Sequence, residues 1–375
     1  MERLTRKEIL VRPDSGTFAT GTTGIVFKIP RRQKRLKKIT LRMNVTLGAN
    51  MVAGDNATDR LEGICSKIKF SISDQGNSVR DMISGCSAEL LAFQRKMGPR
   101  QSRVQQTVLG ATSAGTYDVL VELSCVHPDA DYPMAYYQSI PFWSRNNDGI
   151  GLGDDATLTV DLAAINDNYL GLKTGTVTHN YQKLYLEWFE INDSDPLGRF
   201  YVPREVAFST FTPSAGGTGQ SFAFAKDGYM ASILFQEFAT YSSTQYLRGQ
   251  VLTGDATPGV GVTNTGYYEL FYRGVSIDTF DSLYELHDDE LYCPSFPTDT
   301  APGSTHNLDK RIWMKNFWKP ALGGNPGTLA SCPNLSTENK GDSLFLKPND
   351  ITASTTIRVL TDKFLVSNPN MLAGA

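Results

Sequence analysis

The sequence lacks long hydrophobic runs and has few charged residues for a chain of 375. Charged residues make up 20% of it and hydrophobic residues 40%, and it contains 33 glycines and 18 prolines. No stretch approaches the roughly 18 to 20 apolar residues that a membrane-spanning helix needs. Abundant turn formers with moderate charge favour a globular β protein, and they exclude the collagen, coiled-coil and disordered classes.

Cysteine and histidine are both scarce, with five and four residues. The cysteines are odd in number and form no C-x-x-C pair, so we expect reduced, buried thiols rather than a disulfide framework or a zinc knuckle. No histidine stands in a metal-ligand spacing such as H-E-x-x-H. An apolar segment after the charged N-terminal residues is also missing, so no signal peptide is expected and the chain should stay inside the cell that makes it.

Motifs for catalysis or nucleotide binding are absent as well. The sequence has no G-x-S-x-G elbow, no G-x-x-x-x-G-K-[ST] loop and no G-x-G-x-x-G between a strand and a helix. The glycine-rich segment 149–155, with Asn147 and Asp148 before it, offers oxygen ligands for calcium, but a plain loop is the favoured interpretation. We therefore expect no enzyme, no cofactor, no metal and no small-molecule substrate.

One strongly basic segment stands out near the N-terminus. Residues 1–45 contain 12 Lys or Arg against three acidic residues. Six of the cations fall within eight positions: Arg31, Arg32, Lys34, Arg35, Lys37 and Lys38. This density predicts contact with phosphate, on nucleic acid or on lipid headgroups. The alternative is a solvated connector that precedes a strand.

Hydrophobic periodicity predicts strands throughout the chain. Residues 39–47 alternate strictly between apolar and polar, which is typical of a half-buried antiparallel strand. The pattern recurs at 68–72, 117–125, 158–162 and 184–188 and, after a cluster of turn formers at 193–198, at 206–208, 222–224, 230–238, 268–277, 312–314, 344–346 and 357–359. Two helices are predicted between strands, over 87–97, where Gly98 and Pro99 follow, and more weakly over 281–291.

The order of these elements repeats after about 170 to 190 residues. It predicts an all-β chain of two tandem, eight-stranded antiparallel jelly-roll sandwiches, each with a short helix. We expect an N-terminal arm at 1–16, the first jelly roll at 17–197, the second at 198–366 and a C-terminal tail at 367–375.

Two dense aromatic clusters, at 132–137 and 313–318, are candidates for anchors between subunits. The residues selected from them and from the neighbouring loop are Tyr136, Tyr137, Trp143, Trp313 and Trp318. The alternative is ordinary packing in the core or at the edge of a sandwich.

Several segments together resemble the double jelly-roll major capsid proteins of tailless icosahedral viruses with internal membranes, phages included. They are the apolar strand with its Pro-basic turn at 25–32, the long strand from Leu36, the strands at 117–126 and 157–162, and a pairing of 344–346 with 356–360.

The resemblance implies a structural protein of the virion shell, assembled in the host cytoplasm. A homotrimer would form a pseudo-hexagonal capsomer, and capsomers would tile an icosahedral shell around a membrane or genome. Implied partners are neighbouring capsomers, minor capsid or vertex proteins, and an internal lipid membrane or genomic nucleic acid. Segment 1–14 and the tail would be arms that order on neighbours or stay mobile. The competing interpretation is a carbohydrate-binding or carbohydrate-active tandem β-sandwich.

Overall fold

The computed structural model of the chain separates it into two compact units, made mainly of Met1–Gln94 with Arg100–Ala207 and of Phe208–Lys319 with Thr328–Ala375. The residues that the structure describes are 5–11, 18–30, 32, 34–48, 63–74, 79–96, 115–128, 130, 134–141, 152–164, 177–190, 201–213, 220–238, 267–280, 312–318, 332–335, 342–349 and 356–365.

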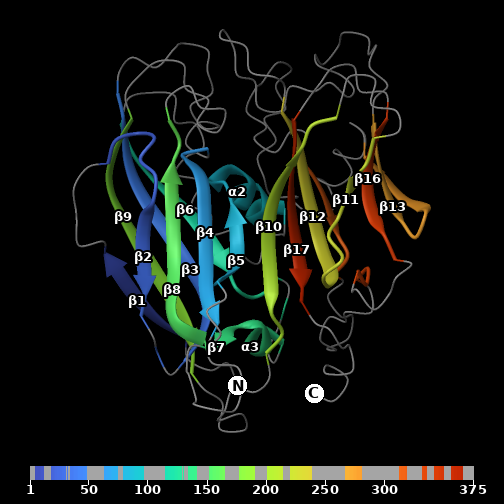
Figure 1. Cartoon of the computed structure of the whole chain (residues 1–375). Coiled ribbons are helices and arrows are strands. Elements are labelled where there is room, and N and C mark those ends of the chain that lie inside the picture. The colour runs from blue at the N-terminus through green and yellow to red at the C-terminus, as the bar shows by residue number, and fades with distance from the viewer. Residues whose placement is uncertain are drawn as a thin grey trace. The chain divides into compact units, whose positions relative to one another are not determined.

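The first unit is built from two antiparallel layers of strands (Figure 1). One layer has the order β1 (Thr5–Val11), β9 (Val177–Phe189), β3 (Arg35–Leu47) and β6 (Gly115–Ser124), and the short β7 (Ile140–Pro141) also pairs with β3. The other has the order β2 (Ile25–Ile29), β8 (Leu152–Leu162), β4 (Cys65–Asp74) and β5 (Val79–Gly85), and a parallel pairing of Ile83 with Val206 continues this sheet into β10 (Arg204–Phe211).

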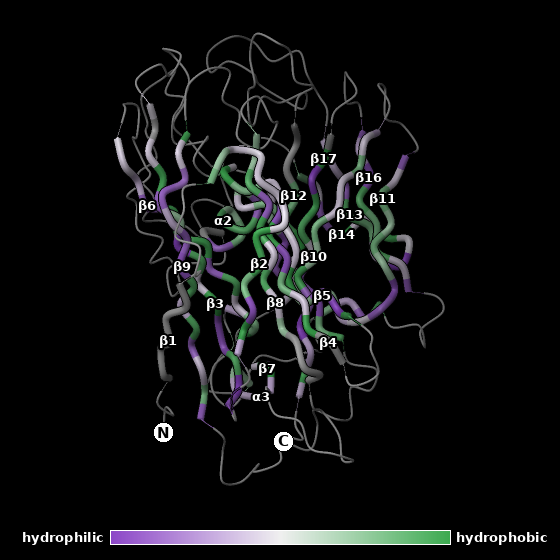
Figure 2. Tube along the Cα trace, turned by 60° about the vertical axis from the view of Figure 1, so that its left-hand side comes forward, coloured by the Kyte–Doolittle hydropathy of each residue, from purple (hydrophilic) through white to green (hydrophobic). Residues whose placement is uncertain are grey.

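Alternating hydropathy explains why these strands form a sandwich. Along β3, the side chains of Ile39, Leu41, Met43 and Val45 are all completely buried, and the polar residues between them are partly exposed. Figure 2 shows the same alternation of hydrophobic and hydrophilic residues along neighbouring strands. Each layer therefore turns one apolar face toward the core and leaves a polar face outside.

The helix predicted at 87–97 is confirmed as α2 (Ser87–Lys96). Its first turn closes where the Leu90 N–H donates to the Cys86 carbonyl at 3.2 Å. The Ser87 hydroxyl accepts a hydrogen bond from the Cys65 N–H at 3.0 Å, which ties the start of α2 to the start of β4. A second helix, α3 (Met134–Gln138), occupies the segment that was expected only as an aromatic cluster.

The second unit also contains two layers. One has the order β15 (Ile312–Asn316), β12 (Tyr229–Phe238), β17 (Thr356–Phe364) and β10 (Arg204–Phe211), where β10 begins in the first unit. The other has the order β11 (Phe222–Ala223), β16 (Leu344–Asn349), β13 (Tyr267–Tyr272) and β14 (Val275–Phe280).

Two predictions for the second unit are wrong. The single strand expected at 268–277 is a hairpin, because Arg273 and Gly274 have positive φ angles of 52° and 78° and form a tight turn between β13 and β14. The register then shifts between Leu270 and Phe271, which leaves a bulge in β14. The expected pairing of 344–346 with 356–360 is also wrong, since β16 pairs with β11 and β13 whereas β17 pairs with β12.

The predicted N-terminal arm needs correction in its centre. Residues Thr5–Val11 form β1, which pairs along its whole length with β9, from Thr5 opposite Phe189 to Val11 opposite Lys183. The backbone of these residues thus belongs to the sheet of its own subunit. The helix expected at 281–291 and the tail at 367–375 lie outside the described residues.

Candidate functional site

Arg35, one of the six basic candidates, is a core residue of the first unit. Its side chain is completely buried and lies over the ring of Tyr136, with the guanidinium carbon 4.6 Å from the ring centroid. Its Nε donates to the Ser139 hydroxyl at 3.0 Å, and its Nη2 donates to the carbonyls of Ser139 at 2.9 Å and Tyr137 at 3.2 Å. Arg35 is therefore wrong as a contact for an external anion, and it fastens α3 to β3 instead.

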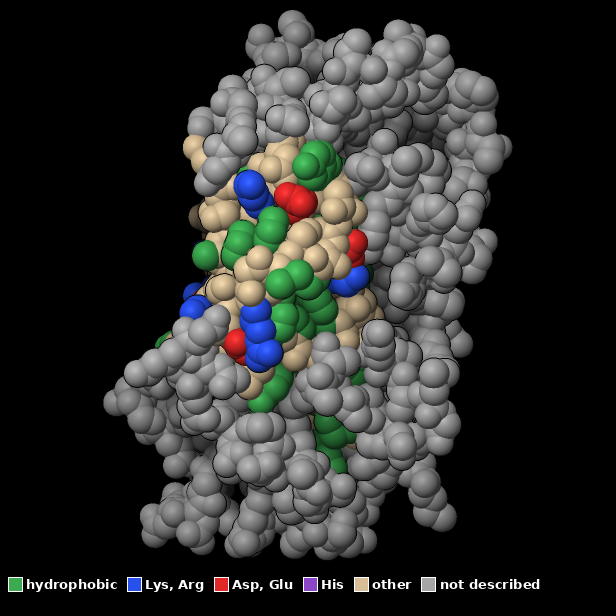
Figure 3. Space-filling model, turned by 90° about the vertical axis from the view of Figure 1, so that its right-hand side faces the viewer, with side chains coloured by type: hydrophobic (Ala, Val, Ile, Leu, Met, Phe, Trp, Pro, Cys, Tyr) green, Lys and Arg blue, Asp and Glu red, His purple; other side chains and the backbone are tan. Residues whose placement is uncertain are grey.

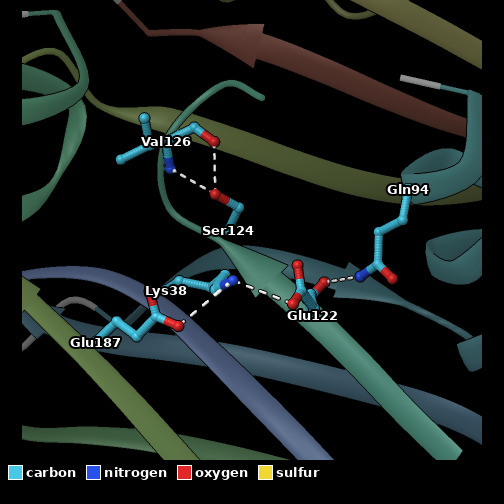
Figure 4. A network of polar contacts seen from close by, with 6 residues as sticks. All are labelled: Lys38, Gln94, Glu122, Ser124, Val126 and Glu187. Atoms are coloured by element: carbon cyan, nitrogen blue, oxygen red, sulfur yellow. Dashed lines mark hydrogen bonds and ion pairs between the residues drawn. The ribbon is translucent and has the colours of Figure 1, made fainter. Parts of the chain in front are cut away.

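Lys38 is held between two carboxylates from neighbouring strands. Its Nζ lies 3.1 Å from Oε1 of Glu122 on β6 and 3.5 Å from Oε1 of Glu187 on β9 (Figure 4). Gln94 of α2 donates to the backbone carbonyl of Glu122 in the same network. These contacts join three strands and α2, so the charge of Lys38 is largely matched within its own subunit.

The other four cations of the basic segment differ in their contacts and in their exposure. Lys34 forms an ion pair with Glu190 at 2.6 Å, and the Nζ of Lys37 lies 5.2 Å from the ring centroid of Phe189. Arg32 is exposed, and Arg31 lies outside the described residues. The structure thus leaves Arg32 as the described cation of the segment that is most open to solvent.

Two of the three tryptophans expected as subunit anchors, Trp313 and Trp318, lie in the core of the second unit. Trp313 is 1% exposed and stacks on Phe235 with ring centroids 5.2 Å apart, and Tyr268 lies 5.6 Å away. Trp318 is also 1% exposed, and its ring centroid lies 5.1 Å from that of Phe364. Because both are covered within one chain, the prediction that they anchor another subunit is wrong.

The tyrosine candidates belong to the first unit. Tyr136 is completely buried and packs edge-on against Phe189 with centroids 6.0 Å apart, so it is also wrong as a subunit anchor. Tyr137 is partly buried and contacts the Tyr136 ring at 5.9 Å. Trp143 lies outside the described residues. For Tyr137 and Trp143 the interface role stays a prediction.

The cysteines of the described segments are free and buried, namely Cys65, Cys86, Cys125 and Cys332. Burial raises the pKa of the Cys125 thiol to about 12 and that of Cys65 further. Both thiols are therefore protonated at neutral pH and unreactive. Within the described segments, no three His, Cys, Asp or Glu side chains gather closely enough to hold a metal ion. No helix in the same segments is long and apolar enough to cross a membrane.

The outer face of the layer that contains β9, β3 and β6 carries polar side chains that pair with one another. Arg42 forms an ion pair with Asp118 at 2.6 Å, and this hydrogen bond holds the pKa of the Asp118 carboxyl below its ordinary value. Asn44 donates to Asp118 at 2.8 Å, and Asn180 donates to Asn44 at 2.8 Å. Such a face offers little apolar area to a partner.

The second unit presents a different surface on β13, β14 and β16. Phe271 and Phe345 stand opposite each other on β13 and β16, and their partly exposed rings stack 4.9 Å apart at an angle of 6°. On β14, Val275 is 64% exposed and Ile277 is 39% exposed. We call these four residues, which come from three adjacent strands, the apolar patch. Figure 3 shows hydrophobic side chains gathered among a few charged ones on this side of the molecule.

The apolar patch was not selected from the sequence. Three of its residues fall within the single strand predicted at 268–277, and Phe345 falls within 344–346, whose predicted partner is 356–360 rather than β13. A two-residue turn at Arg273 and Gly274 was the signal available in the sequence, since glycine favours positive φ.

Comparison with solved structures gives matches along almost the whole chain. The PBCV-1 virus capsid is 12% identical, with 97% of this chain and 94% of that chain covered and a TM-score of 0.58. The STIV MCP is 12% identical, with 99% of this chain and 100% of that chain covered and a TM-score of 0.58. The Faustovirus major capsid protein is 10% identical, with 97% and 91% covered and a TM-score of 0.53. The chain has the double jelly-roll fold.

The all-β, tandem jelly-roll prediction is thereby confirmed, whereas eight strands per roll stay a prediction. No protein-family model and no curated protein sequence matches the chain. At this level of identity the similarity establishes the double jelly-roll architecture, and function has to be argued separately because one fold hosts many functions.

Proposed function

We propose that the chain is a structural major capsid protein whose trimers form pseudo-hexagonal capsomers of an icosahedral virion. The observation that carries the proposal is the match of nearly the whole chain, both jelly rolls included, to capsid proteins from PBCV-1, STIV and Faustovirus. Those neighbours are structural proteins, so we expect no enzymatic activity.

One surface of the second unit supports assembly through side chains. The apolar patch exposes two aliphatic residues, Val275 and Ile277, on one strand of the subunit. A shell of identical copies would cover such side chains against neighbours, which removes apolar area from water. We propose that the apolar patch contacts another copy of the chain, in place of Tyr136, Trp313 and Trp318, which are buried within the subunit.

Size-exclusion chromatography with light scattering tests the proposal on the purified chain. We expect a particle of three times the subunit mass of 41.3 kDa, or larger capsomer assemblies. A monomer that binds sugars would contradict it and favour the carbohydrate-binding tandem sandwich.

The basic segment retains a narrower role in this proposal. We propose that Arg31 and Arg32 contact anionic lipid or nucleic acid inside the virion, since Arg32 is exposed, whereas Lys34 and Lys38 are only partly exposed and Arg35 is buried. Replacing both arginines with Gln is expected to weaken binding to anionic vesicles or to DNA at low salt by several-fold, because each cation lost removes one phosphate contact.

Co-sedimentation with vesicles and a filter-binding assay with DNA would measure the change. The matched control is Lys34→Gln, which removes a cation already paired with Glu190 and should change binding less. Unchanged binding of the double variant would identify the segment as a connector.

The finer organisation follows as part of the same proposal. The bounds 17–197 and 198–366 for the two jelly rolls remain proposals, as do neighbouring capsomers, minor capsid or vertex proteins as partners, and assembly in the host cytoplasm.

A further inference from the structure

Both histidines that the structure describes, His127 and His179, are buried in the first unit. Neither side chain has any exposed surface. A histidine buried as the neutral imidazole resists protonation, whereas the unfolded chain accepts a proton at the ordinary pKa of about 6.5.

His179 lies on β9 opposite Val45 of β3, on the side of the strand that faces the core. Neither of its ring nitrogens has a hydrogen-bond partner, and the next residue along β9 on this side, Gln182, is also buried with both amide atoms unpartnered. Burial lowers the pKa of His179 to about 4.

Burial is the cause of the lowered pKa of His179, without a contribution from a neighbouring charge. The core-facing residues on strands of the opposite layer include Phe70 of β4 and Leu158 of β8, which are apolar and completely buried. The charged residues Arg42, Asp118 and Lys183 alternate to the outer face of the same sheet. The titratable group of α2 that is buried is Glu89, which has contacts of its own.

His127 follows β6 and is placed beside a cation. Its backbone N–H donates to Oε1 of Gln138 at 2.7 Å, and Nη1 of Arg204 donates to the carbonyl of Val126 at 3.2 Å. Burial and the Arg204 guanidinium both lower the pKa of His127 well below 6.5. The other titratable groups of this region are the buried Cys125 and Tyr201, whose pKa values are raised, together with Arg35 and Arg80.

We propose that His179, reinforced by His127, makes the first unit acid-labile, so that mildly acidic solution opens this sandwich of the subunit. Well above pH 6.5 both histidines are neutral in the folded and in the unfolded chain, and they contribute no pH dependence. As the pH falls below 6.5, the unfolded chain binds protons that the folded chain cannot, so the opened state gains population until the folded pKa is reached. This device is independent of trimer formation.

Hydrogen exchange followed by mass spectrometry on the full chain tests the proposal, with rates corrected for intrinsic exchange. Between pH 7 and pH 5, the opening equilibrium of peptides from β9 and β3 is expected to rise about 20-fold from His179 alone, given pKa values of 6.5 and about 4. In His179→Gln, the increase in opening that is due to His179 should disappear. In His127→Gln, the smaller increase that is due to His127 should disappear. The control is His287→Gln, a histidine of the second unit, which should keep the wild-type rise in β9.

Opening of β9 that does not change between pH 7 and pH 5, or a His179→Gln protein with the wild-type pH dependence, would overturn the proposal. Should that variant fail to fold, NMR titration of the wild-type imidazoles decides instead. A His179 ring that titrates near pH 6.5 in the folded protein would contradict it. Since these measurements follow opening within one subunit, their failure is distinct from failure to form a trimer.

Discussion

At the scale of single residues, the charge or aromaticity of a side chain did not show whether it is buried or exposed. Arg35 sits in a run of cations, yet its guanidinium is satisfied by a hydroxyl and two carbonyls inside the subunit. Buried polar groups need such partners, and nothing in residues 31–38 alone shows that Ser139 and Tyr137, a hundred positions later, will supply them. The sequence could predict the cluster of charge but not which cation turns inward.

Trp313 provides a test at this scale. Replacing Trp313 with Ala removes a completely buried ring that packs on Phe235 and Tyr268, so we expect the free energy of unfolding to fall by about 3 to 5 kcal/mol. Urea denaturation of the subunit, followed by circular dichroism, measures it.

The exposed aliphatic residue Val79, at 68% exposure, gives the comparison, since Val79→Ala should change stability by less than about 0.5 kcal/mol. If Trp313→Ala left the stability of the subunit intact and changed only its assembly, the interface role would be restored.

At the scale of elements, strict alternation was a reliable guide. The pattern at 39–47 predicted β3, and those at 117–125 and 184–188 predicted β6 and β9, because each strand has one buried face. It failed for β5, Val79–Gly85, where exposed residues at the start interrupt the alternation. Pairing partners were also unpredictable, because many apolar strands compete for the same neighbours in a sandwich.

The turn between β13 and β14 allows a prediction for an element. Gly274 has a φ of 78° with open space around its α-carbon, so backbone strain rather than crowding limits what can replace it. We expect Gly274→Val to cost about 1 to 2 kcal/mol, because a β-branched residue rarely adopts this conformation.

Gly274→Asn is the matched variant, since asparagine tolerates positive φ and should retain most of the stability. Thermal unfolding of the two proteins compares them. Equal melting temperatures would show that the turn is not strained by a β-branched side chain.

At the scale of the whole molecule, the order of elements carried more information than any motif. Two sets of alternating strands separated by turn formers at 193–198 predicted two tandem jelly rolls, and the fold is double jelly-roll. The surfaces that copies would share could not be predicted in the same way. They depend on which outer faces remain apolar after folding, and the residues of the apolar patch come from strands 70 positions apart.

The apolar patch makes a prediction at this scale. Val275→Lys with Ile277→Lys should reduce or abolish trimer formation, because two lysines would have to be desolvated at the contact. Light scattering at several protein concentrations measures the shift, and circular dichroism should show an unchanged fold, since both side chains are exposed.

The matched control for that experiment is Val79→Lys, an equally exposed valine of the first unit. Trimers of the Val275→Lys, Ile277→Lys protein as stable as the wild type would exclude the patch as an interface.

The bulge in β14 bears on how copies of this subunit separate. β14 ends the order of its sheet among the described strands, and its irregular register with β13 disturbs the row of backbone groups that an added strand would need. Neighbours would then be held by side chains alone, without a shared ladder of hydrogen bonds. Contacts of that kind do not extend the sheet of one copy into the sheet of the next.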